Sequence, residues 1–317
     1  RIHRRHYRLA RILSCETPPA WARVGSHYWA AQYFREASSC YLEAARQAIA
    51  SGSLPEAIEF LRRADHPEAQ RTPAEQRRVL RMQADCLARA GSSNAAADLY
   101  DRLLEEHQHE VNFDEQQATL LRCLSGEQRI RAGQLEEGLA RLRVALRQLG
   151  MVRWSRSRFS YFCLALRTLR MGWIDPQRLV RKPSLQNRDD ASAADPRQPF
   201  NDMERCLNRL SPPLTFLDNQ LGPDLILRMS RRAERSSSDF DRALAITRSG
   251  VLISFAGWRW QRQALQRLRL GRQLARVCRS EEARATSDFC LFIWHIQRGQ
   301  FRASARLGHS ALKLYSD

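Results

Sequence analysis

The most constraining feature of this sequence is a pattern that recurs along it: a small residue, an apolar residue two positions later and a second small residue five positions later. Glycine at the first position can adopt the left-handed conformation that ends a helix. The second small residue falls in the first turns of the next helix, where it lets two backbones approach closely. The pattern therefore predicts helical hairpins joined by tight turns. It occurs at Gly52, Leu54 and Ala57, at Gly91 and Ala96, at Gly133, Leu135 and Gly138, at Ser238, Phe240 and Ala243, at Gly299, Phe301 and Ser304, and without glycine at Gln32, Phe34 and Ala37.

The composition favours helix throughout. The chain has 317 residues, of which 43% are hydrophobic and 27% charged, as in a folded protein. Helix-forming residues dominate, β-branched residues are few, and apolar positions recur every three and four residues. We therefore expect an all-α fold. One helix beginning near Gln134 carries a leucine stripe that should face another helix: Leu135, Leu139, Leu142, Leu146 and Leu149.

The spacing of the glycine junctions indicates a repeat. They lie 39 residues apart (52 to 91) and then 42 apart (91 to 133). The segments from Arg89 to Leu104 and from Arg131 to Leu146 resemble the tetratricopeptide (TPR) family, whose period is about 34 residues. The longer spacing, and the aromatic and proline positions that several units lack, make these degenerate repeats. The resemblance implies a right-handed α-solenoid of antiparallel helical hairpins.

The order of segments predicts four regions. Residues 1–151 form TPR-like hairpins, 152–182 a basic amphipathic helix, 183–199 a linker with three prolines, and 200–317 a second set of hairpins. In the last region, Pro212 and Pro213 are expected to break a helix that begins near Phe200, and Leu221-Gly222-Pro223 to open another. Helical patterns then cover 228–247, 259–279, 282–298 and 301–315.

This order of segments, with Leu149-Gly150-Met151 leading into an arginine-rich helix, has a broader resemblance. It is similar to the C-terminal helical region of large bacterial signalling proteins that join a serine/threonine kinase domain to an AAA-type ATPase. Related repeat tails occur on transcriptional regulators that carry a similar ATPase. The resemblance implies a sensor or docking arm. Because Arg1 opens an arginine-rich segment and Tyr315-Ser316-Asp317 carries no helix-stop signal, we expect a fragment of a longer protein.

The sequence carries no recognisable catalytic motif. It contains no Gly-x-Gly, and neither Lys182 nor Lys313 follows a glycine, so a phosphate-binding loop is excluded. The kinase motifs and a nucleophile elbow are also absent. We therefore expect no enzymatic activity and no cofactor in this segment, with any kinase or ATPase domain lying outside it.

Metal binding is not expected either. His107 and His109 lie two residues apart, so on a helix they point to different faces, and a solvated helix end is the simpler interpretation. His3 and His6 lie among arginines that would repel a cation. The eight cysteines include no pair with the spacing of a zinc knuckle or redox motif. The sequence also has no apolar run of about 20 residues, the length that spans a bilayer. Together these features predict a cytoplasmic protein.

Aromatic residues near position 258 allow two interpretations. Trp258 and Trp260, with Phe255 before them and Arg259 between them, could form a platform for a ligand or base. Core packing at a hairpin junction is the interpretation that we favour. His295, within a helical run of aromatic and apolar residues, is expected to be hydrogen-bonded and partly buried.

The positive charge is concentrated in two segments. The whole chain has 52 basic residues against 34 acidic ones, a net charge of +18. Residues 141–182 hold eleven basic residues and one acid, and 259–279 hold seven arginines and no acid. We favour docking onto an acidic protein surface, or plain solvation, over a nucleic-acid contact or an anionic membrane surface. The candidate interaction residues are Arg153, Arg156, Arg158, Arg167, Arg170, Arg259, Arg262 and Arg269.

Overall fold

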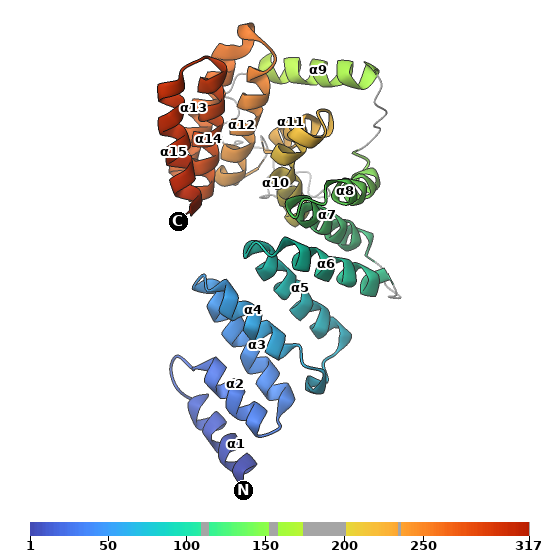
Figure 1. Cartoon of the computed structure of the whole chain (residues 1–317), viewed down its shortest axis with the longest axis vertical. Helices are drawn as coiled ribbons and strands as arrows, with labels where there is room; N and C mark the ends of the chain where they lie inside the picture. The colour runs from blue at the N-terminus through green and yellow to red at the C-terminus, as the bar shows by residue number, and fades with distance from the viewer. Residues whose placement is uncertain (109–113, 152–157, 174–200, 234–235, 317) are drawn as a thin grey trace, which may run out of the picture. The chain divides into compact units, whose positions relative to one another are not determined.

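The computed structural model describes residues 1–108, 114–151, 158–173, 201–233 and 236–316. Within these ranges the chain forms α-helices and short 3-10 turns, with no β-strand (Figure 1). The all-α expectation is therefore confirmed. The chain divides into two compact units, Arg1–Val152 and Arg153–Asp317. The expected linker, 183–199, and both ends of the expected basic helix, 152–157 and 174–182, lie outside the described residues.

In the first unit each helix packs against the next one along the chain (Figure 1). A short 3-10 turn, Pro67–Ala69, precedes α5. The helices are α1 (Ile2–Leu13), α2 (Trp21–Ala30), α3 (Phe34–Ala50), α4 (Leu54–Ala64), α5 (Pro73–Arg89), α6 (Ser93–Gln108), α7 (Glu115–Arg131) and α8 (Leu135–Gln148).

The glycine junctions end helices as the pattern predicts. Gly52, Gly91 and Gly133 have φ angles of +82°, +81° and +84°. The residue after each glycine donates its N–H, at 2.9 Å, to the carbonyl five positions earlier, which is the Schellman arrangement. The small residues that follow, Ala57, Ala96 and Gly138, are buried. Local backbone torsion therefore sets these turns.

The two junctions that have another residue in place of the first glycine, Gln32 and Ser238, differ from each other. Gln32 adopts φ +64° although it is not glycine, and Tyr33 donates its N–H to the carbonyl of Tyr28 at 2.9 Å. Ser238 instead caps the next helix, with its side chain accepting a hydrogen bond from the N–H of Asp241 at 3.2 Å. The same sequence pattern thus marks either the end of one helix or the beginning of the next.

The leucine stripe of α8 is only partly buried. Leu142 and Leu146 are fully enclosed, as expected, but Leu135 is 40% exposed. Helices α7 and α8 approach each other closely at two glycines, Gly126 and Gly138. A Cβ on Gly138 would lie 2.9 Å from the carbonyl oxygen of Gly126. The backbones are therefore closest in the first turn of α8, and the stripe is fully buried only at Leu142 and Leu146.

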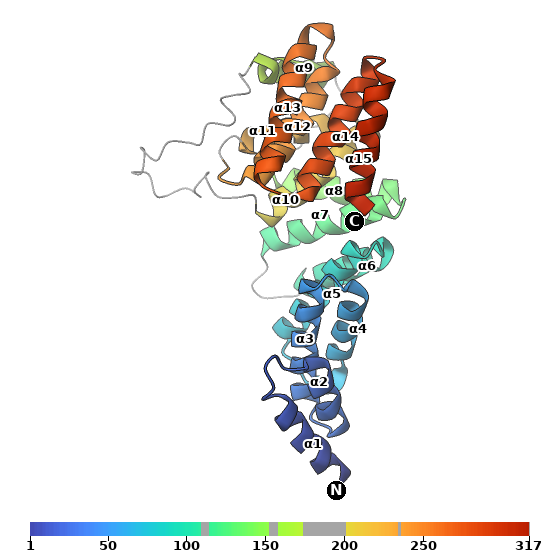
Figure 2. The same ribbon diagram turned by 90° about the vertical axis from the view of Figure 1, so that its left-hand side faces the viewer.

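The second unit holds the remaining helices. α9 contacts α11 and α12, and α14 lies against both α12 and α13. Figure 2 shows α13, α14 and α15 side by side, in agreement with Figure 1. The elements are α9 (Arg158–Trp173), α10 (Asp202–Leu217), α11 (Leu221–Ala233), α12 (Asp239–Ser254), the 3-10 turn Trp258–Trp260, α13 (Gln261–Val277), α14 (Glu281–Gln297) and α15 (Phe301–Ser316).

Two expectations for this unit are wrong. The helix pattern over 228–247 is interrupted, since α11 ends at Ala233 and α12 begins at Asp239. Pro212 and Pro213 do not break the preceding helix, because α10 runs through both to Leu217. Proline at 212 removes the N–H that would bond to the carbonyl of Asn208.

A buried arginine explains how α10 tolerates Pro212. Arg248 of α12 donates to the carbonyl oxygen of Asn208 and, at 2.7 Å, to the side-chain oxygen of the same residue. The hydroxyl of Ser211 also donates to that carbonyl, at 2.9 Å. The acceptor left without its helical partner is therefore satisfied from a neighbouring helix and from within the turn. Among the described helices, none is both long and apolar enough to cross a bilayer.

Candidate interaction surfaces

Helix α13 presents one continuous basic stripe. Arg262, Gln266, Arg269, Gln273 and Arg276 follow one another at steps of four and three, and all five are exposed. No acidic residue occurs in Gln261–Val277. The arginines are two helical turns apart, about 10.5 Å. Arg262 and Arg269 were expected from the sequence, and Arg276 extends their seven-residue spacing, a signal that could have identified it.

Other arginines of the same segment are structural. Arg267 is fully buried and donates a hydrogen bond to the carbonyl oxygen of Met171 in α9. Arg272 forms an ion pair with Asp288 of α14 at 2.8 Å. Counting every arginine of 259–279 as surface charge therefore overstates the basic surface.

The candidate arginines of α9 divide between pairing and exposure. Arg167 forms an ion pair with Asp224 of α11, a buried carboxylate that also accepts from Arg228 at 2.6 Å. A small cavity of about 150 Å³ lies beside this pair. Arg167 is thus a link between α9 and α11. Arg170 is exposed, the side chain of Arg158 is not among those described, and Arg153 and Arg156 lie outside the described residues.

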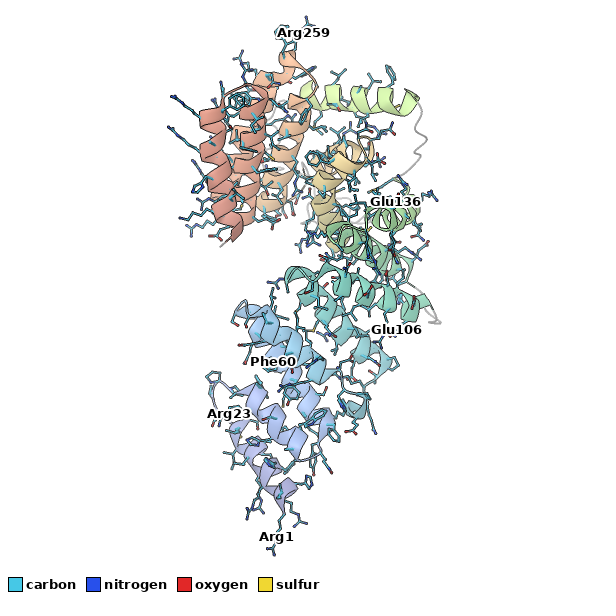
Figure 3. All side chains as sticks on the ribbon, viewed as in Figure 1. Arg1, Arg23, Phe60, Glu106, Glu136 and Arg259 are labelled. Carbon is cyan, nitrogen blue, oxygen red and sulfur yellow. The ribbon has the colours of Figure 1, made fainter. Side chains whose placement is uncertain are left out.

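The aromatic residues near the beginning of α13 point outward. Trp258 is 82% exposed and Phe255 is also exposed, so the expectation of core packing is wrong for both. Gly257, with φ +116°, places Trp258 beyond the end of α12. The guanidinium of Arg259 lies 5.8 Å from the Trp258 ring centroid, and Figure 3 shows Arg259 projecting from the turn between α12 and α13. Trp260 alone packs against the core.

A second exposed feature lies between α14 and α15. An open groove of about 590 Å³ is lined mainly by apolar side chains, among them Phe289 and Phe292 of α14 and Leu312 of α15. At the turn between the two helices, His295 is partly buried and its Nδ1 is hydrogen-bonded to the side-chain oxygen of Gln300 at 2.6 Å, as expected.

The histidines elsewhere serve local structure. His107 is buried and accepts the N–H of Asp114 at 3.2 Å, so the interpretation as a solvated helix end is wrong for it, and His109 lies outside the described residues. His6 is hydrogen-bonded to His27 at 2.9 Å. Burial, His6 and Arg23 lower the pKa of His27. No cluster of potential metal ligands occurs within the part of the chain that the structure describes.

None of the eight cysteines, all of which lie among the described residues, forms a disulfide. Burial raises the pKa of Cys40 to about 11, with Glu36 and Glu43 adding to the shift. Burial also raises the pKa of Cys290 to about 12. Because the thiolate is the reactive species, these two side chains behave as small core residues.

The similarity of this chain to known proteins is distant. No protein-family model matches the chain, and no curated protein matches it. Among solved structures it is similar to BtubC (BKLC) from P. vanneervenii, with 14% sequence identity, a TM-score of 0.47, and coverage of 86% of this chain and 91% of that one. A likeness at this level carries no argument about function.

Proposed function

We propose that this chain is a noncatalytic protein-interaction and regulatory module that docks onto an acidic protein surface through the basic stripe of α13. In this proposal it belongs to a larger bacterial signalling protein whose serine/threonine kinase and ATPase domains supply the catalysis. The observation that carries the docking role is the exposed row of Arg262, Arg269 and Arg276 on a helix without acids.

The contrast with other arginines supports docking over plain solvation. In the first unit, Arg46, Arg63 and Arg102 each pair with an acid three or four positions away on the same helix, as Arg63 does with Glu59 at 2.9 Å. Helix α13 offers its exposed arginines no such partner. Guanidinium groups pair bidentately with carboxylates, so a partner helix with acids every seven residues would match all three positions.

The solenoid arrangement is also part of the proposal. Its support is that consecutive helices of the first unit pack pairwise, that left-handed glycines end α3, α5 and α7, and that the small residue five positions after each junction is buried. A right-handed TPR-like superhelix of antiparallel hairpins would repeat such a unit and expose long helix faces to partners.

A charge-reversal experiment tests the docking role. The full chain is titrated with a fluorescent helical peptide that carries glutamate every seven residues, and separately with duplex DNA. Reversing Arg262, Arg269 and Arg276 to Glu should weaken peptide binding at least about tenfold. The matched control reverses three exposed arginines that pair with acids of their own helix, Arg62, Arg63 and Arg102, which changes the net charge equally and should change the affinity less than about twofold.

The outcomes separate the candidate functions. Equal losses in both triple variants would show a nonspecific charge effect and contradict docking at α13. The same stripe could contact nucleic-acid phosphates, and preferential DNA binding that persists at physiological salt, with a steep salt dependence, would favour that second candidate. Capture of a kinase or ATPase domain by the wild type, and not by the α13 variant, would support the proposed parent.

A further inference from the structure

The groove between α14 and α15 has a specific construction. Its walls are Phe289 and Phe292, whose stacked ring centroids lie 5.8 Å apart, and Leu312 on the opposite helix. Gly308 contributes to its floor, and a Cβ there would lie 3.1 Å from the Phe292 ring. Ala305 also lines the groove. The absence of a side chain at Gly308 therefore lets the Phe292 ring pack closely against α15 where the groove is lined.

Large apolar side chains on this face are exposed to water. Leu312 is 70% exposed and Phe289 is 43% exposed, and Ile296 and Phe301 are also exposed. By helical spacing, Phe301 continues the α15 row that includes Ala305, Gly308 and Leu312. A contiguous apolar face of this kind is typical of a binding site and is costly to leave in contact with water.

The second unit already shows what covers such a face. Helix α14 lies across α12 and α13, with Leu291 and Trp294 buried against Ile253 and Leu268. A helix is thus the element that fills the equivalent surface one hairpin earlier. Among the residues that the structure describes, no helix covers the α14–α15 face, since its large side chains are exposed.

Charge selects among possible helices. Arg302, Arg306 and His309 follow one another at steps of four and three beside the apolar row, and α15 (Phe301–Ser316) contains no acid. The acids Glu281 and Glu282 lie at the beginning of α14. Since the turn at Gly299 reverses the chain and α14 packs against α15, these acids lie toward the far end of α15. Uncompensated positive charge therefore gathers near Arg302 and Arg306.

We infer that the α14–α15 groove binds an acidic amphipathic helix of a partner protein. Its apolar side chains enter the groove beside Gly308, and its carboxylates face Arg302 and Arg306. A second copy of this chain is a poorer occupant, because face-to-face packing of two α15 helices would bring two basic rows together. This surface is separate from the α13 stripe, so either proposal can fail while the other stands.

The test uses the full chain and designed helical peptides of about 18 residues with leucines every three and four positions. One peptide has glutamates flanking the leucines, and its matched partner has lysines at the same positions. Leu312→Glu should weaken binding of the acidic peptide at least about tenfold, and so should the double variant Arg302→Glu and Arg306→Glu. Gly308→Leu, which places a larger side chain against the Phe292 ring in the groove, should weaken binding of the acidic peptide as well. Ala95→Leu, at an exposed alanine of α6, is the control and should leave the affinity within about twofold of wild type.

The possible results distinguish an acidic helix from the other occupants of the groove. Saturable binding of the acidic peptide alone, lost in the Leu312→Glu variant, supports the inference, and this variant alters an exposed residue that the fold does not need. Equal affinity for the lysine-flanked peptide, or no saturable binding, would overturn it. Binding to phosphatidylserine vesicles in preference to the peptide would assign the groove to a membrane surface. A concentration-dependent dimer abolished by Leu312→Glu would assign it to a second copy.

Discussion

In the first unit several arginines lie on helix surfaces beside acids of the same helix, as in Arg102 with Glu106 at 2.9 Å, whereas in the second unit Arg242, Arg248 and Arg267 are buried. Arg267 is fully buried against α9, and Arg248 satisfies a carbonyl in α10. Arginine thus forms surface pairs within a helix in the first unit and buried links between helices in the second. Local charge counts therefore do not measure surface charge.

One cluster in the first unit approaches the second unit's behaviour. Arg129 of α7 bonds to Asp98 and Asp101 of α6 at 2.7 and 2.9 Å, and Arg141 of α8 also pairs with Asp101. The hydroxyl of Ser125 donates to Asp101 at 2.6 Å. The fully buried side chains of this unit are nevertheless mainly alanine and leucine.

The largest effect should come from the apolar interior of the first unit. Leu146→Ala removes a fully buried side chain and should lower the free energy of unfolding by about 2–5 kcal/mol. Leu135→Ala, on the same stripe but exposed, should cost less than about 1 kcal/mol. Urea denaturation followed by circular dichroism measures both. Equal costs would mean that the stripe is buried along its whole length.

A smaller loss should follow removal of a buried arginine in the second unit. Arg248→Ala removes the donor to the Asn208 side chain and one of the two donors to its carbonyl, and should cost about 2–3 kcal/mol. Pro212→Ala restores an N–H that can reach that carbonyl. The double variant should therefore cost about 1 kcal/mol less than the sum of the single variants. Strict additivity in this double-mutant cycle would contradict the role assigned to Arg248.

The smallest effect should come from a surface pair of the first unit. Glu106, labelled in Figure 3 in the last turns of α6, pairs with Arg102 four positions earlier. Glu106→Gln should change the free energy of unfolding by less than about 0.5 kcal/mol, because water and salt screen exposed pairs. Thermal unfolding at low and high salt measures the change. A loss as large as that of Arg248→Ala would erase the distinction between the two units.

The features that could be predicted from the sequence are those set locally. The turns at Gly52, Gly91 and Gly133 depend on backbone torsion within a few residues, and the structure has each of them. The burial of Leu142 and Leu146 follows from helical periodicity. Arg262 and Arg269 are exposed, as a candidate surface requires.

The errors arise where a distant segment decides the environment. The helix continues through Pro212 because Arg248, on α12, donates a hydrogen bond to the carbonyl that the proline leaves without its helical partner. Arg167 is paired because α11 brings Asp224 beside it. Trp258 is exposed because the turn after α12 carries it past the core. No local pattern encodes which helix will cover a given side chain.

The left-handed turns have a consequence for the chirality of the chain. At Gly52, Gly91 and Gly133 nothing lies within 4 Å of where a Cβ would stand, whereas at Gly138 the neighbouring helix occupies that space. The three turns therefore select against the L configuration and not against a side chain as such. In a chemically synthesised first unit, D-alanine would fit all three turns and, by restricting the unfolded chain, would make the unit harder to unfold.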